Sequence, residues 1–254
     1  MRQTAFALKS AFGFLTTIPV GISMEGIEAL MKHVYLFNVV GLILGIILAA
    51  LAYLAGRALP QGLVAILVII AIYKLCGINH IDGLADFGDG VIAHGSIEKK
   101  IAAMKDVHMG TGAGVFMAVM LLAMYSAISG MTSALLPLAL IAAEVSAKQS
   151  MITFAAFSES LQKGLGQMMI ERSTGKDFAI GIVLAALICA GALGALGLAV
   201  LALSQAAALY MILVSRRNFG GSNGDGIGAT NEVCRAVALS AALALGGYLP
   251  WMLL

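Results

Sequence analysis

The sequence predicts an all-α, polytopic integral membrane protein with about seven transmembrane helices. Of its 254 residues, 61% are hydrophobic and 11% are charged, and the mean hydropathy is +0.99. Ordinary soluble proteins carry about 25% charged residues. Several apolar runs are long enough to cross a hydrocarbon core of about 30 Å. The net charge of +2 gives no indication of a nucleic-acid partner. We therefore expect one membrane-embedded domain over residues 1–254, in contact with the lipid bilayer.

The first part of the chain should contain an interfacial helix and two spans. Residues 1–20 are moderately apolar and carry Lys9, which favours a helix lying at the membrane surface. Residues 21–33 are polar enough for a loop or a short surface helix. Residues 34–55 and 63–76 are apolar and form the first two predicted spans. The second span continues directly into an acidic stretch.

The remaining two thirds of the chain should contain the other five spans. Residues 96–106 place apolar side chains on one helical side, as in an amphipathic interfacial helix. Three glycines, at positions 191, 194 and 197, divide a long apolar run into two short spans. The expected spans are residues 113–129, 134–157, the two halves of 178–215, and 236–254. Residues 158–177 and 216–235 are polar and glycine-containing, and we expect both to be loops.

The distribution of basic residues predicts the orientation. With seven spans, ten lysines and arginines fall on the amino-terminal side, whereas the opposite loops contain only Arg57. Loops rich in lysine and arginine remain in the cytoplasm. We therefore expect a multi-pass protein of the cell membrane whose long loops form a cytoplasmic active site. The ten residues are Lys9, Lys32, Lys99, Lys100, Lys105, Lys163, Arg172, Lys176, Arg216 and Arg217.

The acidic stretch, residues 77–90, is the main functional indication. Asp82, Asp86 and Asp89 follow an i, i+4, i+7 spacing, which on a helix aligns three carboxylates in one row. Such a row requires cations, and hard oxygen ligands suit Mg²⁺, with Mn²⁺ as the alternative. A bound divalent ion of this kind commonly completes its coordination with substrate phosphates. His80, just before the row, is a candidate general base or phosphate donor. A solvated helix end is the alternative reading.

Two further glycine-rich segments carry acids. In residues 104–114, Asp106 and His108 precede a Gly-Thr-Gly-Ala-Gly turn whose backbone N–H groups suit an anion. Asp106 is a candidate fourth metal ligand, and Lys105 and His108 are candidate phosphate contacts. Residues 218–232 repeat the pattern with Asp225, a candidate fifth metal ligand. Taken alone, each segment reads equally as a turn or a flexible loop.

Glu144 and Lys148 lie inside the fourth predicted span, four residues apart. A lone charge inside a membrane is costly, and this spacing lets the two side chains pair. A purely structural pair is one interpretation. The other is that Lys148 reaches towards the cytoplasmic face and contacts phosphates.

These motifs resemble those of a known family. The segments HIDGLADFGDG (residues 80–90), MKDVHMGTGAG (104–114), FLTTIPV (14–20) and GGSNGDGIGATNE (220–232) are similar to the corresponding segments of the cobalamin-5′-phosphate synthase family, also called adenosylcobinamide-GDP ribazoletransferase. The resemblance covers essentially the whole chain. The first motif is the specific one, and the others support it.

The resemblance implies a Mg²⁺-dependent phosphotransferase of cobalamin biosynthesis. It would join α-ribazole, or α-ribazole 5′-phosphate, to the phosphoryl group of adenosylcobinamide-GDP and release GMP. In this interpretation Asp82, Asp86 and Asp89 bind metal, with Asp106 and Asp225, while Lys105, His108 and Lys148 hold phosphates. His80 is the base or positions the substrate, and Asp89 is its rival as base. The oligomeric state stays open, and an oligomer is compatible with the sequence.

Three alternatives remain, of which a purely structural membrane subunit would leave the aspartate row unexplained. A CDP-alcohol phosphotransferase also uses aspartates at the membrane face, although its usual spacing has a basic residue soon after the first Asp-Gly, where this chain has Leu84, Ala85 and Asp86. A cation-coupled transporter would use Glu144, Lys148 and the aspartates. It would also need a polar path across the bilayer, for which the other predicted spans offer almost no ionisable group.

Overall fold

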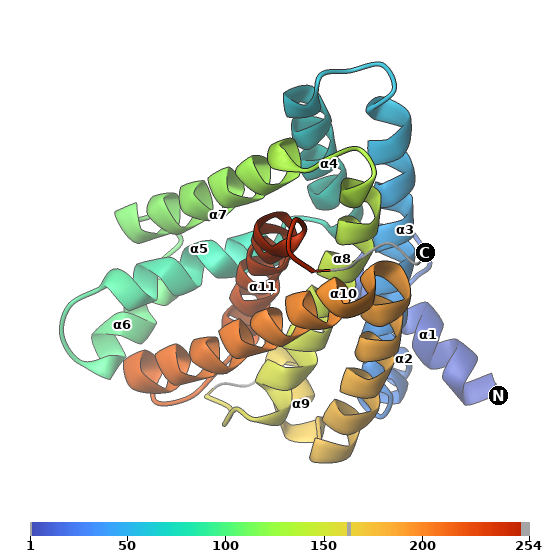
Figure 1. Ribbon diagram of the computed structural model, residues 1–254. Helices are drawn as coiled ribbons and strands as arrows, with labels where there is room; N and C mark the ends of the chain where they lie inside the picture. Colours follow the sequence, from blue (N-terminus) through green and yellow to red (C-terminus); the bar gives the residue numbers. More distant parts are fainter. Residues whose placement is uncertain (1, 162–163, 250–254) are drawn as a thin grey trace.

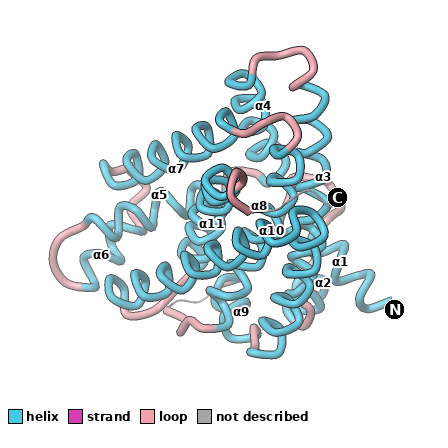
Figure 2. Tube along the Cα trace, in the orientation of Figure 1, coloured by secondary structure: helices cyan, strands magenta, loops and turns pink. Residues whose placement is uncertain are grey.

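The chain folds into a bundle of helices joined by short loops, as the computed structural model shows for residues 2–161 and 164–249 (Figures 1 and 2). Within these residues the only β-type pairing is an isolated bridge between Ser160 and Ser222. An all-α fold is therefore confirmed. The elements are α1 (Arg2–Leu15), α2 (Met24–Met31), the 3₁₀ turn η1 (Val34–Leu36), α3 (Phe37–Ala55), α4 (Gln61–Cys76), α5 (Asn79–Ile92), α6 (Ile97–Met104), α7 (Thr111–Gly130), α8 (Leu135–Ala156), α9 (Leu165–Arg172), α10 (Gly175–Phe219) and α11 (Gly224–Leu245).

Four helical segments of the described chain are long and apolar enough to cross a membrane. They are Val34–Ala55, α7, α8 and α10, and a fifth span results if α4 and α5 are counted together. This composition fits a membrane protein and does not confirm the number seven. The count falls because α4 is short, because the two spans predicted for residues 178–215 are counted as the one helix α10, and because α11, the predicted seventh span, carries charged residues in its first half.

Helix α8 is the centre of the bundle and packs against α3, α10 and α11 (Figure 1). All of its residues from Ala142 to Ala155 are buried. Two glycines let α3 approach it closely. A Cβ atom at Gly41 would lie 2.8 Å from the carbonyl oxygen of Glu144, and one at Gly45 would lie 2.6 Å from the Cα of Ile141. Small residues four apart commonly permit such close helix contacts in membranes.

The sequence suggested that the second span continues directly into the acidic stretch. In the structure α5 instead turns by 96° from the direction of α4. The turn is at Gly77, whose φ of 73° lies in the left-handed region that glycine adopts without strain. Thr17 satisfies the last carbonyls of α4: its backbone N–H donates to Leu75 and its hydroxyl to Lys74, at 2.8 and 2.7 Å. The acidic stretch is therefore a separate helix.

Helix α10 is bent at Gly194 (φ 56°, ψ −134°), which divides it into the two helices predicted for residues 178–215. Two predicted loops are wrong. Residues 158–177 include α9, and residues 216–235 include the start of α11. Asn223 caps α11 by accepting a hydrogen bond from the N–H of Gly226 at 3.0 Å. The expected helix over residues 236–254 belongs to α11 as far as Leu245, and residues 250–254, like Lys163, lie outside the described residues.

Candidate active site

Helix α5 carries the aspartate row as the spacing predicted. Asp82, Asp86 and Asp89 all lie within this one helix. They line a cavity of about 160 Å³ together with Asp106 and His108 from the loop between α6 and α7. The structure therefore brings the first two predicted segments to one site.

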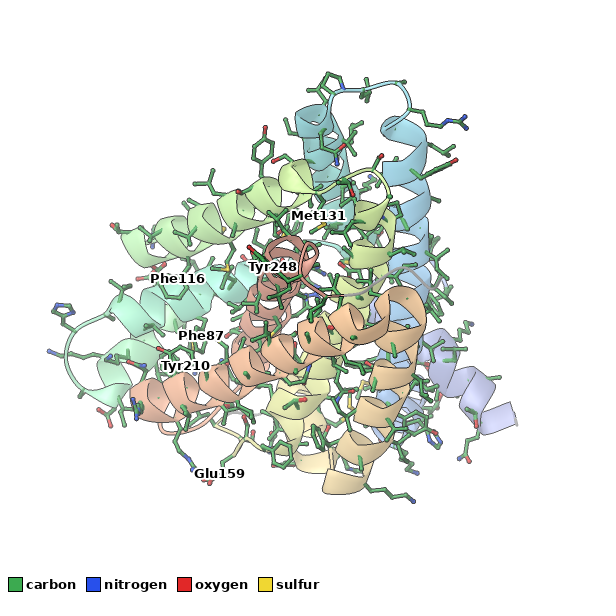
Figure 3. All side chains as sticks on the ribbon, in the orientation of Figure 1. Phe87, Phe116, Met131, Glu159, Tyr210 and Tyr248 are labelled. Carbon is green, nitrogen blue, oxygen red and sulfur yellow. The ribbon has the colours of Figure 1, made fainter. Side chains whose placement is uncertain are left out.

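Glycines hold α5 between α7 and α11. A Cβ atom at Gly83 would lie 3.1 Å from the Cα of Asp225, and one at Gly112 would lie 2.6 Å from the carbonyl oxygen of Gly88. In Figure 3, Phe116 lies between α7 and α5, and Phe87 lies on the side of α5 that faces α10. Such close backbone approach is possible only where a side chain is absent. It fixes the aspartate row against the start of α11.

Asp225, in the first turn of α11, is the predicted acid of the third segment. Its carboxylate accepts a hydrogen bond from Asn223 Nδ2 at 2.7 Å. Burial raises the pKa of Asp225. The hydrogen bond from Asn223 and the charge of Lys105 oppose this rise, and the Asp82 carboxylate adds to it. The charge of Lys105, a predicted phosphate contact, therefore acts on this carboxylate.

The carboxylates of this site act on one another. Burial, and then the charges of Asp225, Asp82 and Asp89, raise the pKa of Asp86 to about 6. Asp86 lies on α5, which is not among the four described segments that are long and apolar enough to cross a membrane on their own. Like charges held close together disfavour ionisation, and an added cation relieves this repulsion. The electrostatics of the site therefore favour a bound cation.

Asp89 also caps helix α7. Its two carboxylate oxygens accept hydrogen bonds from the backbone N–H groups of Gly110 (2.7 Å) and Ala113 (2.9 Å). A carboxylate at a helix N-terminus satisfies N–H groups that have no partner within the helix. Asp89 therefore has a structural role that the sequence did not indicate.

Asp106 and His108 interact with each other at the mouth of the cavity. Asp106 Oδ1 accepts from the backbone N–H of His108 at 2.9 Å and lies 2.8 Å from its Nδ1. These hydrogen bonds lower the pKa of the Asp106 carboxyl. The side chain of His108 is 89% exposed and that of Asp106 is 56% exposed. Both are accessible to a ligand entering the cavity.

The donor set fits a hard divalent cation. Asp82, Asp86, Asp89, Asp106 and Asp225 supply only carboxylate oxygens, the ligands that Mg²⁺ and Mn²⁺ prefer. Within the part of the chain that the structure describes, no three acidic, histidine or cysteine side chains are already placed around one ion position. Metal binding therefore requires side-chain rotation and stays a prediction.

His80 lies on the other side of this region, in a second cavity of about 220 Å³. Asp225 lines this second cavity and not the first, although its charge acts on Asp86 in the aspartate cavity. Burial, followed by the positive charges of Lys148 and Arg235, lowers the pKa of His80 well below its usual value. The lining residues are Phe14, Cys76, Asn79, His80, Met151, Leu165, Gly166, Met169, Gly224, Asp225, Ile227 and Gly228.

Lys148 belongs to a buried polar network beneath His80. Its ammonium lies 3.8 Å from Glu144, which confirms the predicted pair, and donates to Asn231 Oδ1 at 2.8 Å. Arg235 pairs with Glu144 at 2.6 Å and also with Glu232. The sequence placed both Glu232 and Arg235 in a surface loop, which is wrong. Their side chains are at most 2% exposed. Lys148 itself is fully buried, and its contact with phosphates stays a prediction.

The whole chain matches one family of proteins. The family model of cobalamin-5-phosphate synthase matches residues 7–243. The chain belongs to this family. Curated relatives agree: adenosylcobinamide-GDP ribazoletransferase of Methanosarcina mazei is 41% identical and aligns over all of both chains. The enzyme of the same name from Methanococcoides burtonii is 42% identical, over 92% of this chain and 90% of the relative. A more distant one, from Pyrococcus abyssi, is 35% identical over 91% of this chain and 95% of the relative. No solved structure matches.

The structure adds site residues that the sequence did not single out. Asn231 lies between Lys148 and His80, and Asn223 holds Asp225. Tyr73 donates to Glu232 at 3.0 Å from the end of α4. For Asn223 and Asn231 the available indication was their place in the third glycine-rich segment, and for Tyr73 its place just before the acidic stretch. A neutral amide or phenol carries no charge pattern that would distinguish it from a loop residue.

Proposed function

We propose that the protein is an adenosylcobinamide-GDP ribazoletransferase, which joins α-ribazole or α-ribazole 5′-phosphate to adenosylcobinamide-GDP and releases GMP. The family membership supports this activity. The observation that carries the chemistry is the meeting of four carboxylates in one cavity, with a fifth, Asp225, across α5. A cluster of acids with a raised pKa in a cleft is a common property of catalytic sites.

The reaction is a phosphoryl transfer. A ribose hydroxyl oxygen that α-ribazole and α-ribazole 5′-phosphate both carry bonds to the phosphorus attached to cobinamide, and the bond from that phosphorus to the oxygen bridging to GMP breaks. GMP leaves with the electron pair, and the hydroxyl proton goes to a base. Such transfers depend mainly on in-line positioning and on neutralising charge on phosphate oxygens. In this protein both tasks would fall to the aspartate cavity together with the positive charges near it, which are Lys105 and a bound metal ion.

In this proposal Mg²⁺, with Mn²⁺ as the alternative, supplies the positive charge that neutralises the phosphate oxygens. Asp82 and Asp86 would be its main ligands, since no backbone N–H of the described residues donates to their carboxylates, in contrast to Asp89. Asp89, Asp106 and Asp225 complete the set. Lys105 and His108 lie beside these acids and contact the phosphates.

The two cavities suit the two substrates. The aspartate cavity takes the diphosphate. The second cavity is lined by Phe14, Met151, Met169 and Ile227 on its apolar side and by His80 with Asp225 on its polar side. An aromatic base fits apolar walls, and ribose hydroxyls fit the polar end. The acceptor would then place its hydroxyl next to Asp225, whose charge acts on Asp86 in the aspartate cavity.

The alternative of a cation-coupled transporter has less support. The ionisable side chains Glu144, Lys148, Glu232 and Arg235 form one buried network of ion pairs and hydrogen bonds. Their formal charges sum to zero, and no more than 2% of any of the four side chains is exposed. A transport path requires polar groups that exchange ions with water. These four buried side chains are not exposed to the water with which such groups must exchange ions.

The deciding experiment is an assay of GMP release. Purified protein is incubated with adenosylcobinamide-GDP, α-ribazole and Mg²⁺, and then with α-ribazole 5′-phosphate as acceptor. We expect GMP release that depends on the acceptor and stops with EDTA. Absence of release with either acceptor would rule out the proposed transfer, and full release in EDTA would rule out the metal requirement.

Asp82→Asn tests the aspartate row. Loss of a metal ligand removes several kcal/mol of transition-state stabilisation, about a 10³-fold loss of kcat/KM. The variant should fold normally, because it removes one of several mutually repelling charges. Glu28→Gln, an exposed acid on α2, is the matched control and should retain activity. Wild-type rates in Asp82→Asn would remove this residue from the metal site.

A further inference from the structure

His80 sits between the second cavity and the buried network, and its hydrogen bonds define which ring nitrogen carries the proton. Its Nδ1 lies 3.4 Å from Asn231 Nδ2. Its Nε2 has no hydrogen-bond partner within residues 2–161 and 164–249. In a neutral imidazole one nitrogen donates and the other accepts, and the partner of the first determines the role of the second. The orientation of Asn231 is therefore decisive.

Two neighbours fix the amide of Asn231. Lys148 can only donate, and its Nζ lies 2.8 Å from one end of the amide, which must therefore be the oxygen. The other end lies 2.8 Å from Glu232 Oε1, which accepts. A flipped amide would place its NH₂ group against the ammonium and its oxygen against the carboxylate. Both contacts would be repulsive, so the NH₂ group faces Glu232 and His80.

Glu232 is itself held as an acceptor. It accepts from Tyr73 at 3.0 Å through Oε2 and from Arg235 through Oε1. Arg235, fully buried, is a donor that does not lose its proton. Lys148 thus donates to the oxygen of Asn231, and the NH₂ group of Asn231 faces Nδ1 of His80, which accepts. The ring proton must then be on Nε2.

We propose that His80 acts as a hydrogen-bond donor to the substrate through Nε2–H, and that Lys148 and Asn231 hold it in this tautomer. This inference deepens the proposed function and rests on it for the identity of the substrate. A donor at this place suits a ribose or phosphoryl oxygen in the second cavity. His80 is then not the base. The proton of the attacking hydroxyl goes to a carboxylate; among the described residues that line the same cavity this is Asp225, which would then act as the base rather than as a fifth metal ligand.

The tautomer can be measured without any activity. The chain has four histidines, so protein labelled with ¹⁵N-histidine gives few ring signals by solid-state NMR in lipid, and the His80→Gln spectrum identifies those of His80. At pH 8 we expect a protonated Nε2 and an unprotonated Nδ1. In Asn231→Asp a carboxylate faces Nδ1, and the proton should move to Nδ1. A wild-type ring protonated on Nδ1, or on both nitrogens, would overturn the proposal even if the variant does not fold.

Kinetics of two matched variants distinguish a donor from a base. The amide nitrogen of His80→Gln lies near the position of Nε2 and still donates, whereas the shorter His80→Asn places no donor there. We expect kcat/KM of His80→Gln within about tenfold of wild type, and a loss of about 10²-fold or more in His80→Asn. Equal, large losses in both variants would assign His80 as the base. If wild-type protein releases no GMP, the proposed function fails, while the NMR result still decides the tautomer.

Discussion

Replacing Arg235 should destabilise the protein strongly, because this residue neutralises two buried carboxylates. Its Nε lies 2.6 Å from Glu144 Oε1, its second guanidinium nitrogen lies 3.3 Å from Oε2, and a third bond reaches Glu232. In Arg235→Gln the three remaining charges, those of Glu144, Glu232 and Lys148, sum to −1 inside the bundle. Breaking a buried ion pair by removing one partner costs about 3–5 kcal/mol. For a chain of this size that is about 6–20 °C in the unfolding midpoint.

Thermal unfolding in detergent micelles measures this effect. Arg57→Gln is the matched control, since Arg57 is exposed just after α3 and its guanidinium lies over the ring of Tyr53. It should leave the midpoint nearly unchanged. The double variant of Glu232→Gln with Arg235→Gln restores a neutral network and should recover part of the loss. An Arg235→Gln protein that unfolds within about 2 °C of wild type would refute the reasoning.

Two further predictions concern the metal and the orientation. Because the pKa of Asp86 is raised to about 6, it holds a proton at pH 5 that an ordinary aspartate has lost, and the metal must displace this proton. Mn²⁺ affinity, measured by calorimetry, should be about tenfold lower at pH 5 than at pH 7.5, and Asp86→Asn should weaken this dependence; equal affinities would contradict it. For orientation, His94→Cys adds an exposed thiol while the three native cysteines are buried. A membrane-impermeant maleimide should label it only after cell lysis, and labelling of intact cells would reverse the assignment.

Much of the site could be predicted from the sequence because its signals are local. In a chain with so few charges, three aspartates at helical spacing stand out, and α5 has that spacing as a helix. The turn at Gly194 followed from the glycines within one apolar run. The start of α11 was missed because Gly224, Gly226 and Gly228 read as a loop. In the structure these small residues let α11 pack closely against Phe154 and α5.

The sequence by itself determined the class of the protein and the acids of its site, because hydropathy and helical period are properties of consecutive residues. Only the tertiary structure decided what each polar group faces. Arg235 meets Glu144 across 91 positions, and Asn231 meets His80 across 151. No local pattern specifies such contacts, which depend on how α8, α11 and α5 pack. The same packing separates the row of Asp82 and Asp86 from the cavity of His80, and it gives His80 the tautomer of a donor.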